Sequence, residues 1–101
     1  MIILNTTFVV ERAIYDAFVG WLKELYVPAA LATGLFSSSR LAQILSNDEP
    51  GVISIACELQ GESLSECVRW HDETALLLRN DMAARWGEKA MFFTTYLKKI
   101  D

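Results

Sequence analysis

The sequence contains few of the residues that nucleic-acid, metal and disulfide sites need. Its 101 residues include one histidine and two cysteines, and the net charge is -4. No segment concentrates lysine or arginine, so a phosphate backbone would be repelled and we expect no nucleic-acid partner. Cys57 and Cys67 lack the C-x-x-C spacing of zinc sites, and we expect neither a metal site nor a disulfide. They are typical of small buried hydrophobic side chains in a reducing compartment.

Long hydrophobic segments are also missing. The uncharged stretch 27–39 contains proline, glycine and three serines, and it is too short to cross a bilayer. Residues 1–5 have neither the basic segment nor the apolar core of a signal peptide. The sequence therefore predicts no membrane partner and a cytoplasmic protein. With 52% hydrophobic and 22% charged residues, it is typical of one globular domain over residues 1–101.

Two hydrophobic periods alternate along the chain. A period of two residues predicts strands, and a period of 3.6 residues predicts helices. The strands are expected over residues 2–10, 38–46, 53–60 and 89–98, and the helices over residues 11–26 and 63–86. The resulting βαββαβ order predicts a ferredoxin-like α+β fold. Right-handed crossovers then give a four-stranded antiparallel sheet, ordered 4-1-3-2, with both helices on one face.

Local signals mark where these elements begin, bend and end. Pro28 predicts a bend or an extra helical turn after the first helix, because proline lacks the N–H of a regular helix. Pro-Gly within residues 47–51 predicts a tight turn and hence a hairpin. Ser63 and Glu66 form a capping box before the second helix, and Gly87 is typical of its C-terminal cap.

The sheet face away from the helices is left open in this fold. Its polar residues are expected to be Asn5, Thr7, Ser54 and Glu58, with Ala56 among them. The last strand is apolar on both sides, so its outward side stays undecided at this point. One side carries Met91, Phe93 and Leu97, and the other carries Ala90, Phe92 and Tyr96.

Self-association follows from the apolar part of that face. If Phe92 and Tyr96 lie outward with Ile3 and Val9, the exposed patch reaches hundreds of Å², about the upper limit for a monomer. We therefore expect a two-fold homodimer with the open faces packed together. A monomer with a sufficiently polar open face is the alternative.

Several segments carry a family resemblance that spans the whole chain. They are Asn5–Phe8, Trp21–Leu22, Tyr26–Pro28, Leu31 with Gly34–Leu35, and Phe92–Thr95. In these segments the chain resembles an uncharacterised bacterial family known only as a domain of unknown function. That family is similar to the dimeric α+β barrels, the superfamily of the antibiotic-biosynthesis-type monooxygenases and the haem-degrading enzymes. The resemblance implies a dimer and transfers no activity, because one fold hosts many functions.

The haem-degrading branch offers a comparison residue by residue. Asn5 and Trp70 match its first-strand asparagine and its helix tryptophan. The place of its haem-ligating histidine falls on Asn80, which is no axial ligand, and His71 lies about 100° round the helix from Trp70. We therefore expect no haem and no other cofactor.

The candidate ligand site comprises Asn5, Thr7, Ser54, Glu58 and Tyr96, with one of the threonines 94 and 95 beside them. These groups would orient a small polar ligand between the sheet and its partner. The alternative is ordinary hydrogen bonding between subunits. If the barrel closes over Glu58, desolvation would raise the pKa of its carboxyl and make it a proton carrier.

Two hypotheses on function remain open. The first is a non-enzymatic homodimer that binds a small ligand or a partner through its sheet cavity. The second is a cofactor-independent monooxygenase or isomerase acting on a small cyclic or aromatic substrate, with His71, Glu58 and Asn5 as catalytic candidates. His71 lies on the apolar stripe of the second helix, so it is either a general base facing a pocket or a packed histidine bonded to a carbonyl or water.

Overall fold

The computed structural model describes residues 1–46 and 49–101. Its strands are β1 (Ile2–Glu11), β2 (Phe36–Ile44), β3 (Val52–Gly61) and β4 (Ala90–Lys98). The first helical segment comprises η1 (Arg12–Ile14), α1 (Tyr15–Trp21), η2 (Leu22–Tyr26) and α2 (Val27–Ala32). The second comprises α3 (Leu64–Arg69), η3 (Trp70–Thr74), α4 (Ala75–Trp86) and the short η4 (Gly87–Lys89).

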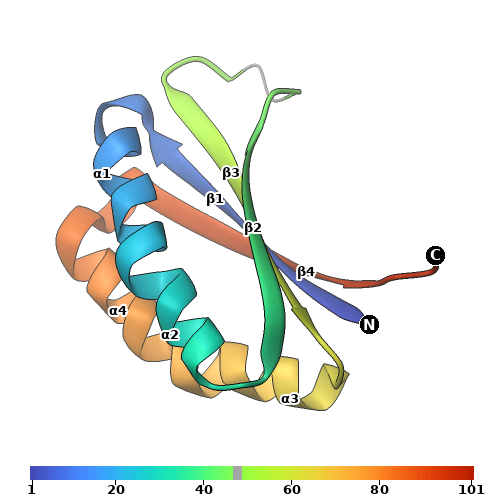
Figure 1. Cartoon of the computed structure of the whole chain (residues 1–101). Helices are drawn as coiled ribbons and strands as arrows, with labels where there is room; N and C mark the ends of the chain where they lie inside the picture. Colours follow the sequence, from blue (N-terminus) through green and yellow to red (C-terminus); the bar gives the residue numbers. More distant parts are fainter. Residues whose placement is uncertain (47–48) are drawn as a thin grey trace.

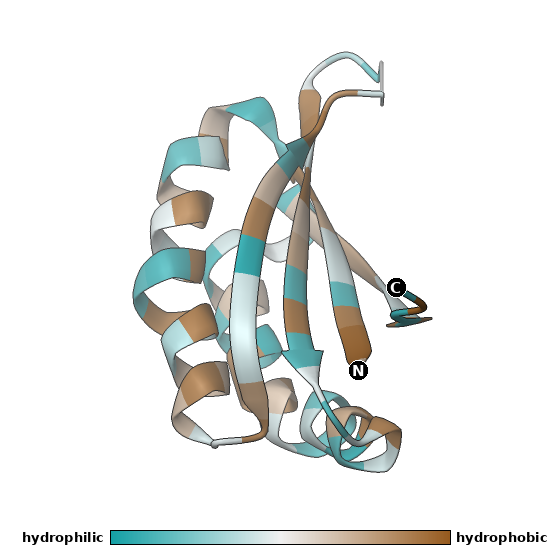
Figure 2. Cartoon of the chain, turned by 45° about the vertical axis from the view of Figure 1, so that its right-hand side comes forward, coloured by the Kyte–Doolittle hydropathy of each residue, from teal (hydrophilic) through white to brown (hydrophobic). Residues whose placement is uncertain are grey.

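The four strands form one antiparallel sheet in the order β2-β3-β1-β4. Both helical segments cover the same face of this sheet, and among the described residues no element covers the other face (Figure 1). Figure 2 shows the strands with the helices stacked on one side only. The predicted α+β fold, the βαββαβ order and the strand order are confirmed.

The central strand β1 divides the sheet into two chemically different faces. Its helix-covered side chains are Leu4, Thr6, Phe8 and Val10, which are at most 1% exposed. Side chains alternate along a strand, so the odd-numbered residues of β1 lie on the open face. The third strand follows the predicted alternation, with Ile53, Ile55, Cys57 and Leu59 buried toward the helices.

A chain of aromatic rings joins both helical segments to β1. The ring centroid of Phe8 lies 5.2 Å from that of Phe18 and 5.5 Å from that of Tyr26. Tyr26 in turn meets Trp70 of the second segment at 5.9 Å in an edge-to-face arrangement. Such pairs add about 0.5–1.5 kcal/mol each beyond the area that they bury. They fix the helical layer over one face.

Pro28 is accommodated by a π-helical turn. The N–H of Val27 donates to the carbonyl of Leu22, five residues back, so η2 is wider than a regular helix. Pro28 then lies in the first turn of α2, where its missing N–H costs nothing. The predicted bend after the first helix thus takes the form of a widened turn between two short regular pieces.

The second helical segment begins and ends as predicted. The Glu66 N–H donates to the Ser63 hydroxyl at 3.2 Å, and Gly87 ends α4 with a φ of 55°, in the left-handed region. An unpredicted contact joins the two segments: the Trp21 indole N–H donates to the Asp81 carboxylate at 2.9 Å. That bond is the main cause that lowers the pKa of Asp81.

The edge strands differ in two ways from the sequence predictions. β2 spans residues 36–44 rather than 38–46, because Phe36 is buried under the helices whereas Leu45 is 80% exposed. On β4, Phe92 and Tyr96 lie on the helix-covered side, so the arrangement with both of them outward is wrong. The reason is the register, in which Phe92 pairs with Phe8 and Tyr96 pairs with Leu4.

The hairpin between β2 and β3 is confirmed, and Gly51 has a φ of 83°, as a tight turn requires. Asn47 and Asp48 of the predicted loop lie outside the described residues. Within the described ranges, no helix is long and apolar enough to span a membrane.

Two glycines offer a matched test of this packing. A Cβ on Gly61 would lie 2.9 Å from both the Cys67 sulfur and the Leu35 carbonyl oxygen, whereas a Cβ on Gly20 would meet nothing within 4 Å. We expect Gly61→Ala to lower the free energy of unfolding in urea, and Gly20→Ala to raise it by about 0.5–1 kcal/mol. Equal effects of the two substitutions would contradict the close approach of β3 to α3.

Candidate functional site

The cross-strand register arranges the open face in rows that run across all four strands. One row, which we call the polar row, consists of Arg40, Glu58, Asn5 and Thr95, in the order β2, β3, β1, β4. On one side of the polar row lie two further rows, which together we call the apolar end. The nearer row consists of Ala42, Ala56, Thr7 and Phe93. The farther row consists of Ile44, Ser54, Val9 and Met91. The row on the other side consists of Ser38, Gln60, Ile3 and Leu97.

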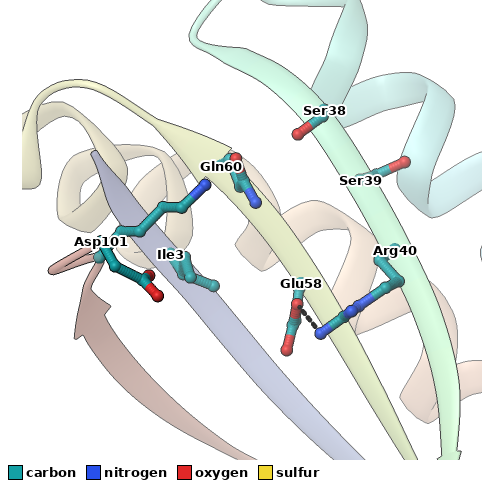
Figure 3. Close-up of a pocket in the computed structure, with 8 residues that line it drawn as sticks. Ile3, Ser38, Ser39, Arg40, Glu58, Gln60 and Asp101 are labelled. Carbon is teal, nitrogen blue, oxygen red and sulfur yellow. Dashed lines mark ion pairs between the residues drawn. The ribbon is translucent and has the colours of Figure 1, made fainter.

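An ion pair forms the β2 half of the polar row. Arg40 reaches from β2 to β3 and donates to the Glu58 carboxylate at 2.9 Å (Figure 3). The Glu58 side chain is 20% exposed, whereas the Arg40 side chain is 72% exposed. The Glu58 side chain is therefore largely covered by its neighbours, whereas most of the Arg40 side chain remains in contact with solvent.

The β1 member of the row has an unused acceptor. The Asn5 Nδ2 group donates to the Thr7 hydroxyl at 3.4 Å. The Asn5 Oδ1 atom is buried and has no hydrogen-bond partner among the described residues. Since most buried polar atoms are paired, an acceptor of this kind marks a place where a donor is expected.

A cavity of about 480 Å³ opens beside the polar row. Its lining is mostly polar and charged and consists of Ile3, Ser38, Ser39, Arg40, Glu58, Gln60, Lys99 and Asp101. Figure 3 shows the Arg40 and Glu58 side chains meeting over the strands, with Ile3 and Asp101 across from them. The cavity therefore combines hydroxyl, amide, cationic and anionic groups near one apolar side chain.

The structure brings only part of the predicted ligand set together. Asn5 and Glu58 are direct cross-strand neighbours on the open face. Thr7 and Ser54 lie on the same face but are 4% and 3% exposed, so their neighbours already cover them. Tyr96 lies on the helix-covered face, away from the other four.

His71 is held on the helix-covered side of β4. Arginine is always a donor, so Arg79, 3.4 Å from Nδ1, donates to that atom. Nε2 therefore carries the proton of the neutral ring and donates to the Thr94 hydroxyl at 2.8 Å. Phe92 and Tyr96 flank the ring, with centroids at 6.2 and 6.4 Å. His71 is a packed histidine with both nitrogens bonded.

Burial and the Arg79 charge lower the pKa of His71, and Asp72 opposes them in part. The sheet separates this neutral imidazole from Asn5 and Glu58, because Thr94, to which it bonds, shares the face of the buried Thr6. The three catalytic candidates of the monooxygenase hypothesis are therefore not gathered at one place.

Sequence reasoning missed the partners of these residues. Arg40 was not among the predicted open-face residues, although the hairpin register would have placed it beside Glu58. Lys99 and Asp101 had no signal of their own, because the C-terminal residues reach the cavity only through the path of the chain after β4.

The cysteines are free and buried, as predicted. Burial is the main cause that raises the pKa of the Cys57 thiol to about 12, with a smaller contribution from the neighbouring Glu58 charge. Within the part of the chain that the structure describes, no three His, Cys, Asp or Glu side chains are grouped to hold a metal ion.

Comparison with known families gives one match. The model of a family described as a domain of unknown function, DUF4286, matches residues 1–100, so the chain belongs to that family. No curated protein matches the chain. No solved structure matches it either.

His71 is the only histidine, which makes its titration measurable through stability. Its pKa in the folded chain lies below the ordinary 6.5, so the folded chain binds fewer protons than the unfolded chain just below that pH. The free energy of unfolding should therefore fall as the pH drops through about 6.5, and it should level off below the lowered folded pKa. Urea titrations between pH 5 and 8 measure this.

His71→Gln should remove that pH dependence while leaving the fold detectable by circular dichroism. A wild-type stability that rises as the pH falls toward 5 would show a histidine with a raised pKa and would contradict the neutral, arginine-bonded ring.

Proposed function

We propose that this DUF4286 protein is a homodimeric α+β barrel that binds a small ligand in the cavity on its open sheet face. One observation carries the proposal. The open face combines exposed large apolar side chains at the apolar end with a polar row and a cavity beside it. A face of this kind offers one area for a partner and another for a ligand.

The apolar part is large for a solvent-exposed surface. At the apolar end Met91 is 65% exposed and Phe93 is 57% exposed, and on the other side of the polar row Leu97 is 41% exposed. Together they expose on the order of 300 Å², about the size of the largest apolar patch on a typical monomer. Because all three lie on the open side of β4, one partner surface would cover them together.

A second copy of the chain is the occupant that fits by size. A face of four strands, about 4.8 Å apart and about 30 Å long, covers roughly 600 Å² in projection. Side-chain relief brings it near the ~800 Å² per partner of standard stable interfaces. In a two-fold dimer the two whole open faces pack together, the polar row of each copy included.

The cavity fits a ligand site in size and chemistry. Its volume of about 480 Å³ lies within the ~300–1,000 Å³ of small-molecule sites. Such sites combine a few polar groups that orient the ligand with apolar walls, and they are often placed at subunit boundaries. In the proposed dimer, the second copy supplies an apolar wall that one chain lacks.

The dimer is tested by placing a charge in the apolar end. We expect wild type to scatter light as a dimer at micromolar concentration, and Phe93→Asp to scatter as an 11 kDa monomer, because a buried unpaired carboxylate opposes association. Leu77→Asp is the matched control, because Leu77 is 73% exposed on α4 and lies on the helical side. A wild-type monomer, or dissociation by the control alone, would refute the proposed interface.

The ligand site is tested by filling the cavity. Ser38→Trp places a large ring in the cavity lining, whereas Gln43→Trp places it on the opposite face of the same strand. We expect a thermal-shift screen of small polar metabolites to find compounds that stabilise wild type and Gln43→Trp. Ser38→Trp should lose that stabilisation. Compounds that stabilise all three proteins equally bind elsewhere, and an empty screen would remove the ligand-binding proposal.

A further inference from the structure

We infer that the ligand of this site carries a primary ammonium group, which binds between the Glu58 carboxylate and the Asn5 amide oxygen. This inference rests on the proposed ligand-binding function and names its chemical class: a small aliphatic amine. The hydrogen-bonding groups of the open face that remain unused decide which ligand class fits.

The unused groups at the centre of the polar row are acceptors. The Asn5 amide N–H donates to the Thr7 hydroxyl, and the buried Oδ1 atom of Asn5 has no donor among the described residues. Glu58 lies directly across from Asn5 in the register, where cross-strand Cβ atoms are about 4.5–5.5 Å apart. Two neighbouring acceptors favour a ligand group that has several donors and no acceptor. An ammonium group has three donors.

The present partner of Glu58 is easily displaced. Arg40 is the one cation within 4 Å of Glu58 among the described residues, and its side chain is 72% exposed. Exposed ion pairs contribute little to stability, so the guanidinium group can move into water at small cost. An ammonium group is a more compact charge than guanidinium and has three donors for the two neighbouring acceptors.

The surroundings favour a cation that bears a carbon chain. Ile3 follows Asn5 on the cavity side of the polar row and is the apolar side chain of the cavity lining. An aliphatic chain in the cavity would lie on Ile3. The chain has a net charge of -4, which raises the local concentration of cations rather than anions.

An anionic ligand is the competing class, because Lys99 and Arg40 also line the cavity. It would meet Glu58 and Asp101 in the same lining, and it would leave the Asn5 acceptor unpaired. These repulsive and unsatisfied groups make an anion the poorer fit.

Isothermal titration of the wild-type protein with four probes tests the inference: n-butylamine, 1,4-diaminobutane, sodium butyrate and 1-butanol. We expect the two amines to bind, and butyrate and butanol to bind at least tenfold more weakly. Glu58→Gln should weaken amine binding at least tenfold, and Asn5→Leu should weaken it several-fold. Glu62→Gln is the matched control, because Glu62 is exposed and lines a separate surface near Gly34.

The possible failures are distinguishable. Binding of butyrate that Ser38→Trp abolishes, with no binding of amines, would overturn the ammonium inference and leave the ligand site standing. Equal loss of amine binding in Glu58→Gln and Glu62→Gln would show a general charge effect and would also overturn it. If no probe binds and the broader screen is empty, both the inference and the proposed function fail.

Discussion

The register of the central strand β1 is the constraint on which the rest of the structure depends. Each residue from Ile2 to Val10 of β1 pairs with one residue on β3 and one on β4, so the alternation of this one strand assigns both neighbours to their faces. A slip by one residue would exchange the faces and place Asn5 under the helices. Leu4, Phe8 and Val10 prevent that slip, because all three are fully buried in the core between the sheet and the helices.

The same register creates the functional surface. With the helices committed to one face, the outward residues of four strands line up as the polar row and the apolar end. The polar row pairs one strong cation with one carboxylate and leaves the Asn5 acceptor without a donor. The apolar end exposes Met91 and Phe93, which make contact with water costly. The proposed partner binding and the proposed ligand binding would thus both follow from a single division of the sheet.

The sequence was sufficient to predict the fold, because each strong local pattern is compatible with only one kind of secondary structure. The alternation of β3, the capping box at Ser63 and the glycine at position 87 agree with their places in the structure. The outward side of β4 could not be predicted, because both of its sides are apolar. The register with β1 decides it, and the pairs Phe92–Phe8 and Tyr96–Leu4 are contacts between residues far apart in the sequence.

The candidate site was less predictable than the fold, because it too depends on contacts between residues far apart in the sequence. Asn5 and Glu58 could be placed on one face from alternation alone. The contact between His71 and Thr94 joins residues 23 positions apart on different elements, and no local pattern signals it. His71 lies in the π-helical turn η3, where the spacing of side chains departs from 3.6 residues per turn, so the stripe of the second helix gave no reliable direction for the His71 ring.

The central claim is that two open faces pack against each other, and intermolecular nuclear Overhauser effects test it most directly. In a dimer assembled from one isotope-labelled and one unlabelled copy, filtered spectra detect contacts between the copies alone. The account predicts such contacts for the methyl groups of Met91, Val9 and Ala56. Intermolecular contacts confined to methyl groups of the helical layer, such as that of Leu77, would contradict it.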